Sequence, residues 1–213
     1  FALDPLHNVV LAASRTAQGS SFTTADIGPA VKSTDTAFRP VYIVNAPDGS
    51  LLVADLYEHY IAHGQHYQSQ IDAGTGRIYR LRGKDAGLEK DVNLMAKTGP
   101  ELVKLLGHPN KWHRQTAVRL LGERRDPGTQ PLLRNLLTMD AGIASAGALW
   151  SLYQAGWLTE ADEKAALRHP SATVRLWAVR FMGERLGSHP GIGLPPSPAV
   201  RVSGPQTIPE LAE

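Results

Sequence analysis

The chain has 213 residues, of which 42% are hydrophobic, and a formal net charge of +2. This length and this hydrophobic content suit one or two globular domains with buried cores, and the small net charge argues against a nucleic-acid partner. Because the chain has no cysteine, disulfides, thiolate metal sites, a nucleophilic thiol and the attachment motif of a c-type haem are excluded. No apolar run approaches the roughly 20 residues that cross a bilayer.

The first 37 residues predict one strand and one loop. The run Val9–Ala13 is apolar, as expected of a strand, and residues 14–24 are rich in Ser, Thr and Gly, as expected of a loop. The chain begins with Phe1 and lacks the charged start and the apolar core of a signal peptide. We therefore expect a fragment or a processed form.

Residues 38–81 carry the clearest strand and turn signals. Two β-favouring runs, 41–44 and 51–54, flank Pro47-Asp48-Gly49, in which proline fixes φ, aspartate can bond the local backbone and glycine tolerates a positive φ. A third run, 77–81, alternates charged and apolar residues. These patterns predict four or five strands in an antiparallel, blade-like arrangement, too few to close a propeller or barrel of their own.

Beyond residue 92 the hydrophobic period changes from about two to about 3.6, which predicts helices. Thr98-Gly-Pro-Glu101 is a capping box with proline in the first turn. The phrase at 108–124, which begins His-Pro and ends Gly-Glu-Arg, returns at 169–185, and Ala148 marks a degenerate copy between them. Units of about 30 residues indicate an α-solenoid of about three helix pairs, which resembles the HEAT family.

The predicted fold class is therefore an α+β multidomain chain, with a partial β-propeller-like antiparallel sheet followed by an α-solenoid of HEAT-like repeats. Residues 1–82 form the propeller-like part, 83–92 the linker and 93–187 the solenoid. Residues 188–213 contain six prolines and are expected to be an extended tail.

Three histidines between the second and third strands, His59, His63 and His66, are candidate metal ligands. Their spacings of four and three would place the imidazoles on one face of a helix, where neutral nitrogens can bind a metal or accept a proton. The alternative is a solvated polar loop in which one histidine bonds a backbone carbonyl and the others face water.

Arg39 and Asp55 are candidate active-site residues. The Arg39 guanidinium could bind a ligand that carries a carboxylate, or it could form a structural ion pair with Asp35 or Asp55. Asp55 ends a predicted strand, a usual place for an active-site carboxylate and also for a turn bond to the backbone.

Arg114 and Arg175 occupy equivalent positions in the two copies of the repeated phrase. They are candidates for binding an acidic protein partner. The alternative is a role in packing within the repeats.

The order of motifs along the chain resembles one family. The motifs are Ser33-Thr-Asp-x-x-Phe-Arg-Pro-Val41, Pro47-Asp-Gly-x-Leu-x-Val-x-Asp-x-Tyr57 and Gly76-Arg-Ile-Tyr-Arg80, followed by HEAT-like repeats. In this order they resemble multidomain membrane-bound dehydrogenase-type proteins. In these proteins a propeller similar to quinoprotein glucose or sorbosone dehydrogenases is joined to HEAT repeats and often to a c-type haem domain.

The resemblance implies that the parent protein oxidises a sugar or alcohol with a pyrroloquinoline quinone (PQQ)-like cofactor and calcium. It also implies electron transfer to haem c on a separate domain and a periplasmic, extracytoplasmic location. Arg39, Asp55 and Tyr57 match motif positions, and His63 and His66 match a His-rich stretch of the family. This chain would supply the closing blade and the HEAT scaffold, with no cofactor of its own and no activity alone.

The alternative to a dehydrogenase portion belongs to the binding class. It is a non-catalytic HEAT-repeat interaction module whose β region caps the solenoid and whose repeats hold a protein partner.

Overall fold

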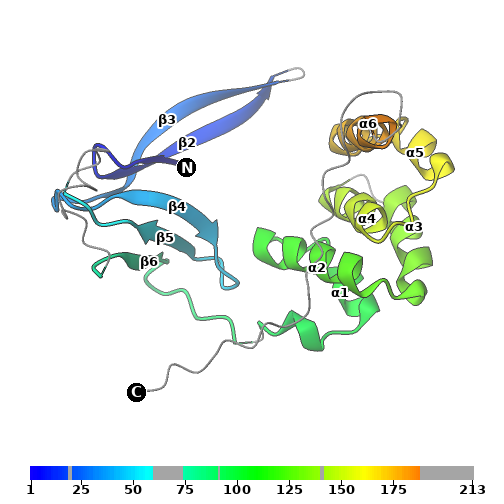
Figure 1. Cartoon of the computed structure of the whole chain (residues 1–213), viewed down its shortest axis with the longest axis horizontal. Helices are drawn as coiled ribbons and strands as arrows, with labels where there is room; N and C mark the ends of the chain where they lie inside the picture. The colour runs from blue at the N-terminus through cyan, green and yellow to red at the C-terminus, as the bar shows by residue number, and fades with distance from the viewer. Residues whose placement is uncertain (19–20, 60–73, 91, 140–141, 188–213) are drawn as a thin grey trace. The chain divides into compact units, whose positions relative to one another are not determined.

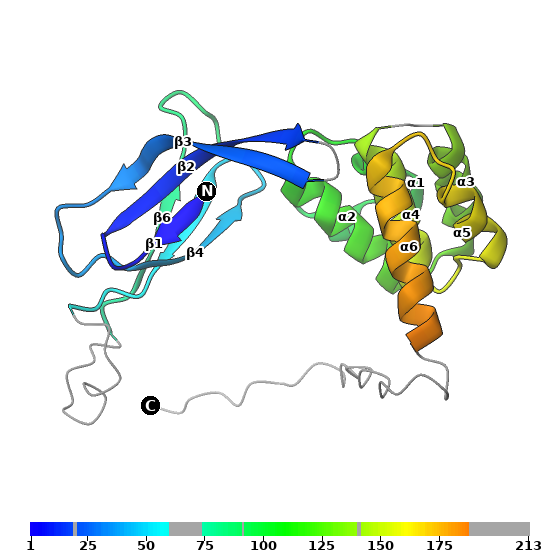
Figure 2. The same ribbon diagram turned by 90° about the horizontal axis from the view of Figure 1, so that it is seen from above.

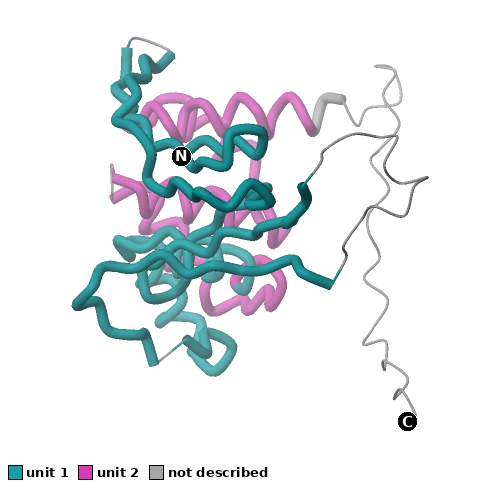
Figure 3. The backbone as a smooth tube through the Cα atoms, turned by 90° about the vertical axis from the view of Figure 1, so that its left-hand side faces the viewer, with its two compact units in different colours: residues 1–120 teal, residues 121–213 magenta. Residues whose placement is uncertain are grey.

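The computed structural model describes residues 1–18, 21–59, 74–90, 92–139 and 142–187. The chain divides into two compact units, residues 1–120 and 121–213 (Figure 3). The division falls inside helix α2, which spans Lys111–Arg124.

Unit 1 contains two three-stranded antiparallel sheets, each with its strands in chain order (Figure 1). The first sheet consists of β1 (Ala2–Asp4), β2 (Val9–Gln18) and β3 (Ser21–Lys32), and the second of β4 (Pro40–Asn45), β5 (Leu51–Asp55) and β6 (Arg77–Leu81). Both sheets are meanders, in which each strand pairs with the next one along the chain. The described residues form no closed barrel and no complete propeller.

The long β2–β3 ribbon corrects the prediction for residues 14–24, which were expected to form a loop. Strand pairing in this ribbon continues from Val9↔Lys32 to Gln18↔Ser21 (Figure 2). The described residues therefore contain six strands where four or five were expected. Beyond Ala13 the described side chains of β2 are exposed, so no buried face imposes the alternation by which a strand is recognised in a sequence. Pairing shifts near Ala12, opposite Gly28, whose φ of +126° suits the bulge there.

The predicted β4–β5 hairpin is confirmed. Gly49 has a φ of +83°, and the N–H of Ser50 donates to Oδ1 of Asp48 at 3.0 Å, so the turn uses the residues expected of it. Arg80 on β6 donates to Oδ2 of Asp48 at 3.1 Å. The third predicted strand, 77–81, is β6.

Val53 and Phe38 are buried on one side of the second sheet. The Phe38 ring meets the Tyr79 ring edge to face, with centroids 5.7 Å apart. Alternate residues on the opposite side of the sheet include Tyr42 and Ile78, and these are exposed. The second sheet therefore has one packed face and one open apolar face.

The turn of the β4–β5 hairpin contacts the start of α2 within unit 1. The Asn110 side chain donates to the carbonyls of Ala46 at 2.9 Å and Pro47 at 2.7 Å. Nε2 of His113 donates to the Pro47 carbonyl at 3.1 Å, since a carbonyl only accepts. Sequence reasoning gave no indication of these contacts because they join residues more than 60 positions apart.

The helical region consists of three consecutive helix pairs, preceded by a short 3-10 helix (Leu94–Ala96). The pairs are α1 (Gly99–Leu105) with α2, α3 (Gln130–Met139) with α4 (Ile143–Gln154), and α5 (Glu160–Ala166) with α6 (Ala172–Gly187). A second 3-10 helix, Pro127–Thr129, precedes α3. None of the helices in the described ranges combines the length and the apolar character needed to span a bilayer.

A capping box lies at the start of α1 and of α5, which are the first helices of the first and third helix pairs. The carboxylate of Glu101 accepts from the N–H and hydroxyl of Thr98 at 2.7 and 2.6 Å, as the sequence predicts. These bonds, the hydroxyl first, lower the pKa of Glu101. Asp162 accepts equivalent bonds from Thr159 at the start of α5, so the first and third repeats begin with the same capping box.

Candidate functional site

Arg39 is buried, and each of its three guanidinium nitrogens donates to a backbone carbonyl. Nε donates to Glu58 at 2.8 Å, Nη1 to Pro5 at 2.9 Å and Nη2 to His59 at 3.0 Å. The side chain thereby joins the N-terminal segment to the chain that follows β5. Among the described residues the guanidinium therefore binds carbonyls and not Asp35 or Asp55, while binding of a carboxylate-bearing ligand stays a prediction.

Asp55 lies at the end of β5 and is also buried. Its Oδ1 accepts from the backbone N–H of Arg39 at 2.7 Å and of Tyr57 at 2.9 Å, the second being the turn bond weighed from the sequence. Its Oδ2 is buried without a hydrogen-bond partner among the described residues. The carboxylate thus fixes the end of the strand with one oxygen.

Tyr57 has a φ of +55°, a conformation that is uncommon for a bulky side chain. The Asp55 turn bond holds its backbone, and the Arg77 guanidinium lies 4.0 Å from the centre of its ring. Interaction with the Tyr57 side chain raises the pKa of Arg77 above its usual value, so the guanidinium stays charged. The His59 ring lies edge-on to Tyr57, with centroids 6.4 Å apart.

The structure therefore brings Arg39, Asp55, Tyr57 and His59 to one end of the second sheet. His63 and His66 lie outside the described residues, so the three-histidine hypothesis stays a prediction. Within the described ranges, no group of three or more His, Asp or Glu side chains is placed to hold a metal ion.

A hollow of about 260 Å³ lies elsewhere on unit 1. It is lined by residues of the β3 end, by Phe38 and by residues of β5 and β6, including Val31, Val53 and Tyr79. Arg39, Asp55 and Tyr57 are not among its lining residues. The polar cluster and the hollow are therefore separate features.

Arg114 and Arg175 make the same contacts in the first and third repeats. Nη1 of Arg114 donates to the carbonyls of His108 and Pro109 at 2.6 and 2.7 Å, and Nη1 of Arg175 donates to those of His169 and Pro170 at 2.6 and 2.7 Å. These carbonyls belong to the turn between the two helices of each repeat. The geometry favours the packing alternative that the sequence left open.

The histidines of these two turns share a role as well. Nδ1 of His108 accepts the N–H of Asn110 at 3.0 Å, and Nδ1 of His169 accepts the N–H of Ser171 at 3.1 Å. Nε2 of His169 lies 2.9 Å from the carbonyl of Leu137 and donates to it, since a carbonyl only accepts. In both copies the His-Pro turn is therefore held by a histidine–backbone bond and by an arginine of the following helix.

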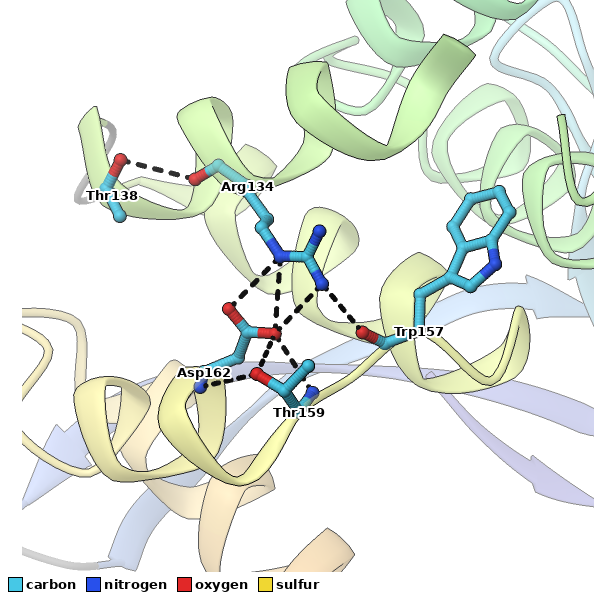
Figure 4. A network of polar contacts seen from close by, with 5 residues as sticks. All are labelled: Arg134, Thr138, Trp157, Thr159 and Asp162. Carbon is cyan, nitrogen blue, oxygen red and sulfur yellow. Dashed lines mark hydrogen bonds and ion pairs between the residues drawn. The ribbon is translucent and has the colours of Figure 1, made fainter. Parts of the chain in front are cut away.

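An ion pair joins the first helices of the second and third repeats in unit 2 (Figure 4). Nε of Arg134 on α3 lies 3.3 Å from Oδ1 of Asp162 on α5, and Nη2 donates to the Trp157 carbonyl at 3.0 Å. Burial acts to raise the pKa of Asp162, but the bonds from the Thr159 hydroxyl and N–H and from Arg134 outweigh it, so the pKa is lowered. Sequence reasoning missed this pair, although Thr159-x-x-Asp162 repeats the capping pattern of Thr98-x-x-Glu101.

Two family models match the chain, one over the β region and one over most of the helical region. Residues 1–85 match the model described as a domain of unknown function (DUF7133), and residues 99–169 match the model of HEAT repeats. The helical region is HEAT-like. Neither the curated proteins nor the solved structures include a match. The HEAT resemblance is therefore supported, whereas nothing found in these comparisons points to a quinoprotein dehydrogenase.

Proposed function

We propose that this chain is a non-catalytic interaction module whose HEAT-like repeats bind a protein partner. The observation that carries the proposal is the set of three consecutive helix pairs, two of which repeat the same His-Pro turn with the same arginine contacts. Stacked helix pairs create extended surfaces that suit protein binding.

The polar cluster in unit 1 supports the non-catalytic part of the proposal. A binding or catalytic arginine needs donors that face a ligand, whereas Arg39 is buried and uses three of its five N–H groups on backbone carbonyls. Asp55 likewise holds two backbone N–H groups with one oxygen. These contacts stabilise the local fold.

Affinity capture with the full chain as bait tests this function. A matched bait carries Ala148→Asp, which places a charge at a fully buried position of α4 and should unfold the repeats. We expect a protein that saturates the wild-type bait near one to one and is not retained by the variant. Failure of any protein to saturate the wild-type bait would contradict the proposal.

A second candidate is supported by the β region: the two sheets serve as neighbouring blades in a dehydrogenase-type propeller. Each sheet is a meander, and the first strands of the two sheets, β1 and β4, lie against each other, as the inner strands of adjacent blades do. The open apolar face with Tyr42 and Ile78 would be covered by a further blade.

The described residues do not fit the quinone and calcium that the resemblance implies. Calcium takes six to eight oxygen ligands, and no acidic cluster lies in this part of the chain. Three of the five Arg39 N–H groups that a quinone carboxylate could use already donate to carbonyls. The second candidate therefore assigns these strands a structural role and no chemical step.

The test of the second candidate uses the product of the complete gene, with added quinone, calcium and a sugar or alcohol. Dye reduction that requires all of these and is lost in Ile78→Lys would support the blade role, because a charge on the open face would prevent blade packing. Absence of dye reduction would contradict it.

A further inference from the structure

The outer face of α6 carries an apolar stripe formed by Leu176, Val179 and Gly183. Spacings of three and four place these residues on one side of the helix. Leu176 and Val179 are 61% and 62% exposed to solvent.

The opposite side of α6 is covered by α4. The Tyr153 ring stacks on Phe181 with centroids 3.8 Å apart, and the Trp150 ring meets Trp177 edge to face at 4.8 Å. The stripe therefore lies on the side of α6 that faces away from the preceding repeat, where the next helix of the stack would pack.

In the first repeat the surface equivalent to this stripe is covered by a helix of the next repeat. Gly122 in α2 is equivalent to Gly183 in α6, at an offset of 61 residues. A Cβ placed on Gly122 would lie 2.7 Å from Cβ of Gln154, so α4 passes directly over this glycine. A Cβ placed on Gly183 would meet no heavy atom of the described residues within 4 Å.

Val179 is also more exposed than the equivalent residue of an inner repeat. It follows Ala178, as Leu149 follows the equivalent Ala148 in the second repeat. Leu149 is fully buried, whereas Val179 is exposed. Glycine within a helix destabilises it relative to alanine, and a Cβ on Gly183 would meet no heavy atom of the described residues that explains the choice of glycine.

We propose that this stripe binds an amphipathic helix of another protein, which lies across Gly183 as α4 lies across Gly122. The stripe continues the stack in which α4 packs on α6, so its natural ligand is a helix with an apolar ridge.

The inference rests on the proposed function and gives the partner a chemical class. Residues 188–213 are a poor source of the bound helix, because their six prolines interrupt helical hydrogen bonding. A second copy of the chain and these C-terminal residues are therefore alternatives that the experiment must separate.

The probe is a helix-stabilised peptide with the α4 sequence, residues 143–154, titrated into the full chain by fluorescence anisotropy. We expect saturable binding that weakens at least tenfold in Val179→Glu and in Gly183→Leu. The matched control Met139→Glu, which changes a residue that is 79% exposed at the end of α3, should bind within twofold of wild type. Circular dichroism melts establish that each variant is folded.

Three results would overturn the inference. Equal binding by wild type and Val179→Glu would remove the stripe as the docking surface. A wild-type dimer in sedimentation that Val179→Glu dissociates would assign the stripe to a second copy. A tenfold gain in peptide binding when Ile208 and Leu211 are both changed to Ser would assign it to the C-terminal residues.

The outcome for the stripe and the outcome for the proposed function are distinguishable. If a natural partner saturates both wild-type and Val179→Glu baits, the repeats bind protein through another surface. If the peptide binds through the stripe but no natural partner is captured, the stripe is a helix-binding surface and the proposed function is contradicted.

Discussion

The β region and the helical repeats both use arginine to hold backbone carbonyls, but over very different distances in sequence. Arg114 and Arg175 bind carbonyls five and six residues away, within one turn. Arg39 binds carbonyls 19, 20 and 34 residues away and ties together separate segments. A local device can be recognised from its repetition in the sequence, whereas a long-range one resembles a binding site until its partners are seen.

The largest expected effect is at Arg39. Arg39→Ala leaves three carbonyls without their donor and opens a gap in a buried site, so we expect a loss of about 3 kcal/mol or more in the free energy of unfolding. Urea denaturation followed by circular dichroism measures it. If Arg39→Ala left stability nearly unchanged but abolished binding of a ligand, Arg39 would be a ligand-binding residue and not a structural one.

The repeat arginines should have smaller effects that are equal in the two copies. Arg114→Ala and Arg175→Ala each remove two charge-assisted bonds at partly exposed turns, for an expected loss of about 1 to 2 kcal/mol. Thermal melting monitored at a helical wavelength is the measurement. If both variants melt as wild type does but lose partner capture, these residues bind the partner and the packing interpretation is wrong.

The Arg134–Asp162 pair gives a pH-dependent prediction. Because the pKa of Asp162 is lower in the folded chain than in the unfolded one, its stabilisation is complete above the unfolded pKa near 4 and is lost as the pH falls through the folded pKa. Asp162→Asn should cost about 1 kcal/mol at pH 7 and less as the pH falls below 4. A difference between wild type and variant that is constant from pH 7 to pH 3 would contradict this role.

Replacing each of the two equivalent glycines, Gly122 and Gly183, by alanine should change the free energy of unfolding in opposite directions. Gly183→Ala should stabilise the chain by about 0.5 to 1 kcal/mol, because alanine favours helix and the space is open. Gly122→Ala should destabilise it by about 1 kcal/mol, because the new methyl group meets Gln154. Parallel urea titrations of the two variants provide the comparison, and changes of the same sign would show that the two surfaces are alike.

Much of the fold could be predicted because its signals are local. Pro47-Asp48-Gly49 specifies the β4–β5 turn, Thr98 and Glu101 specify the start of α1, and the repeated His-Pro phrase indicates the helix pairs. The β2–β3 ribbon could not be predicted, because most of its side chains are exposed and leave no alternating pattern. Backbone pairing alone defines it.

The candidate sites were harder to predict, because the sequence shows residue types but not their partners. Arg39 and Asp55 do lie close together, yet their contacts are with backbone groups. The stripe on α6 is invisible in the sequence for the opposite reason: Val179 and Gly183 match the residues of the first repeat, and only their exposure distinguishes them.

The most direct test of the central claim is hydrogen exchange of the full chain with and without its captured partner. We expect slower amide exchange in α6, residues 172–187, and no change around Arg39 and residues 55–59. Protection confined to Arg39 and residues 55–59, with α6 unchanged, would contradict it and place the binding function in the β region.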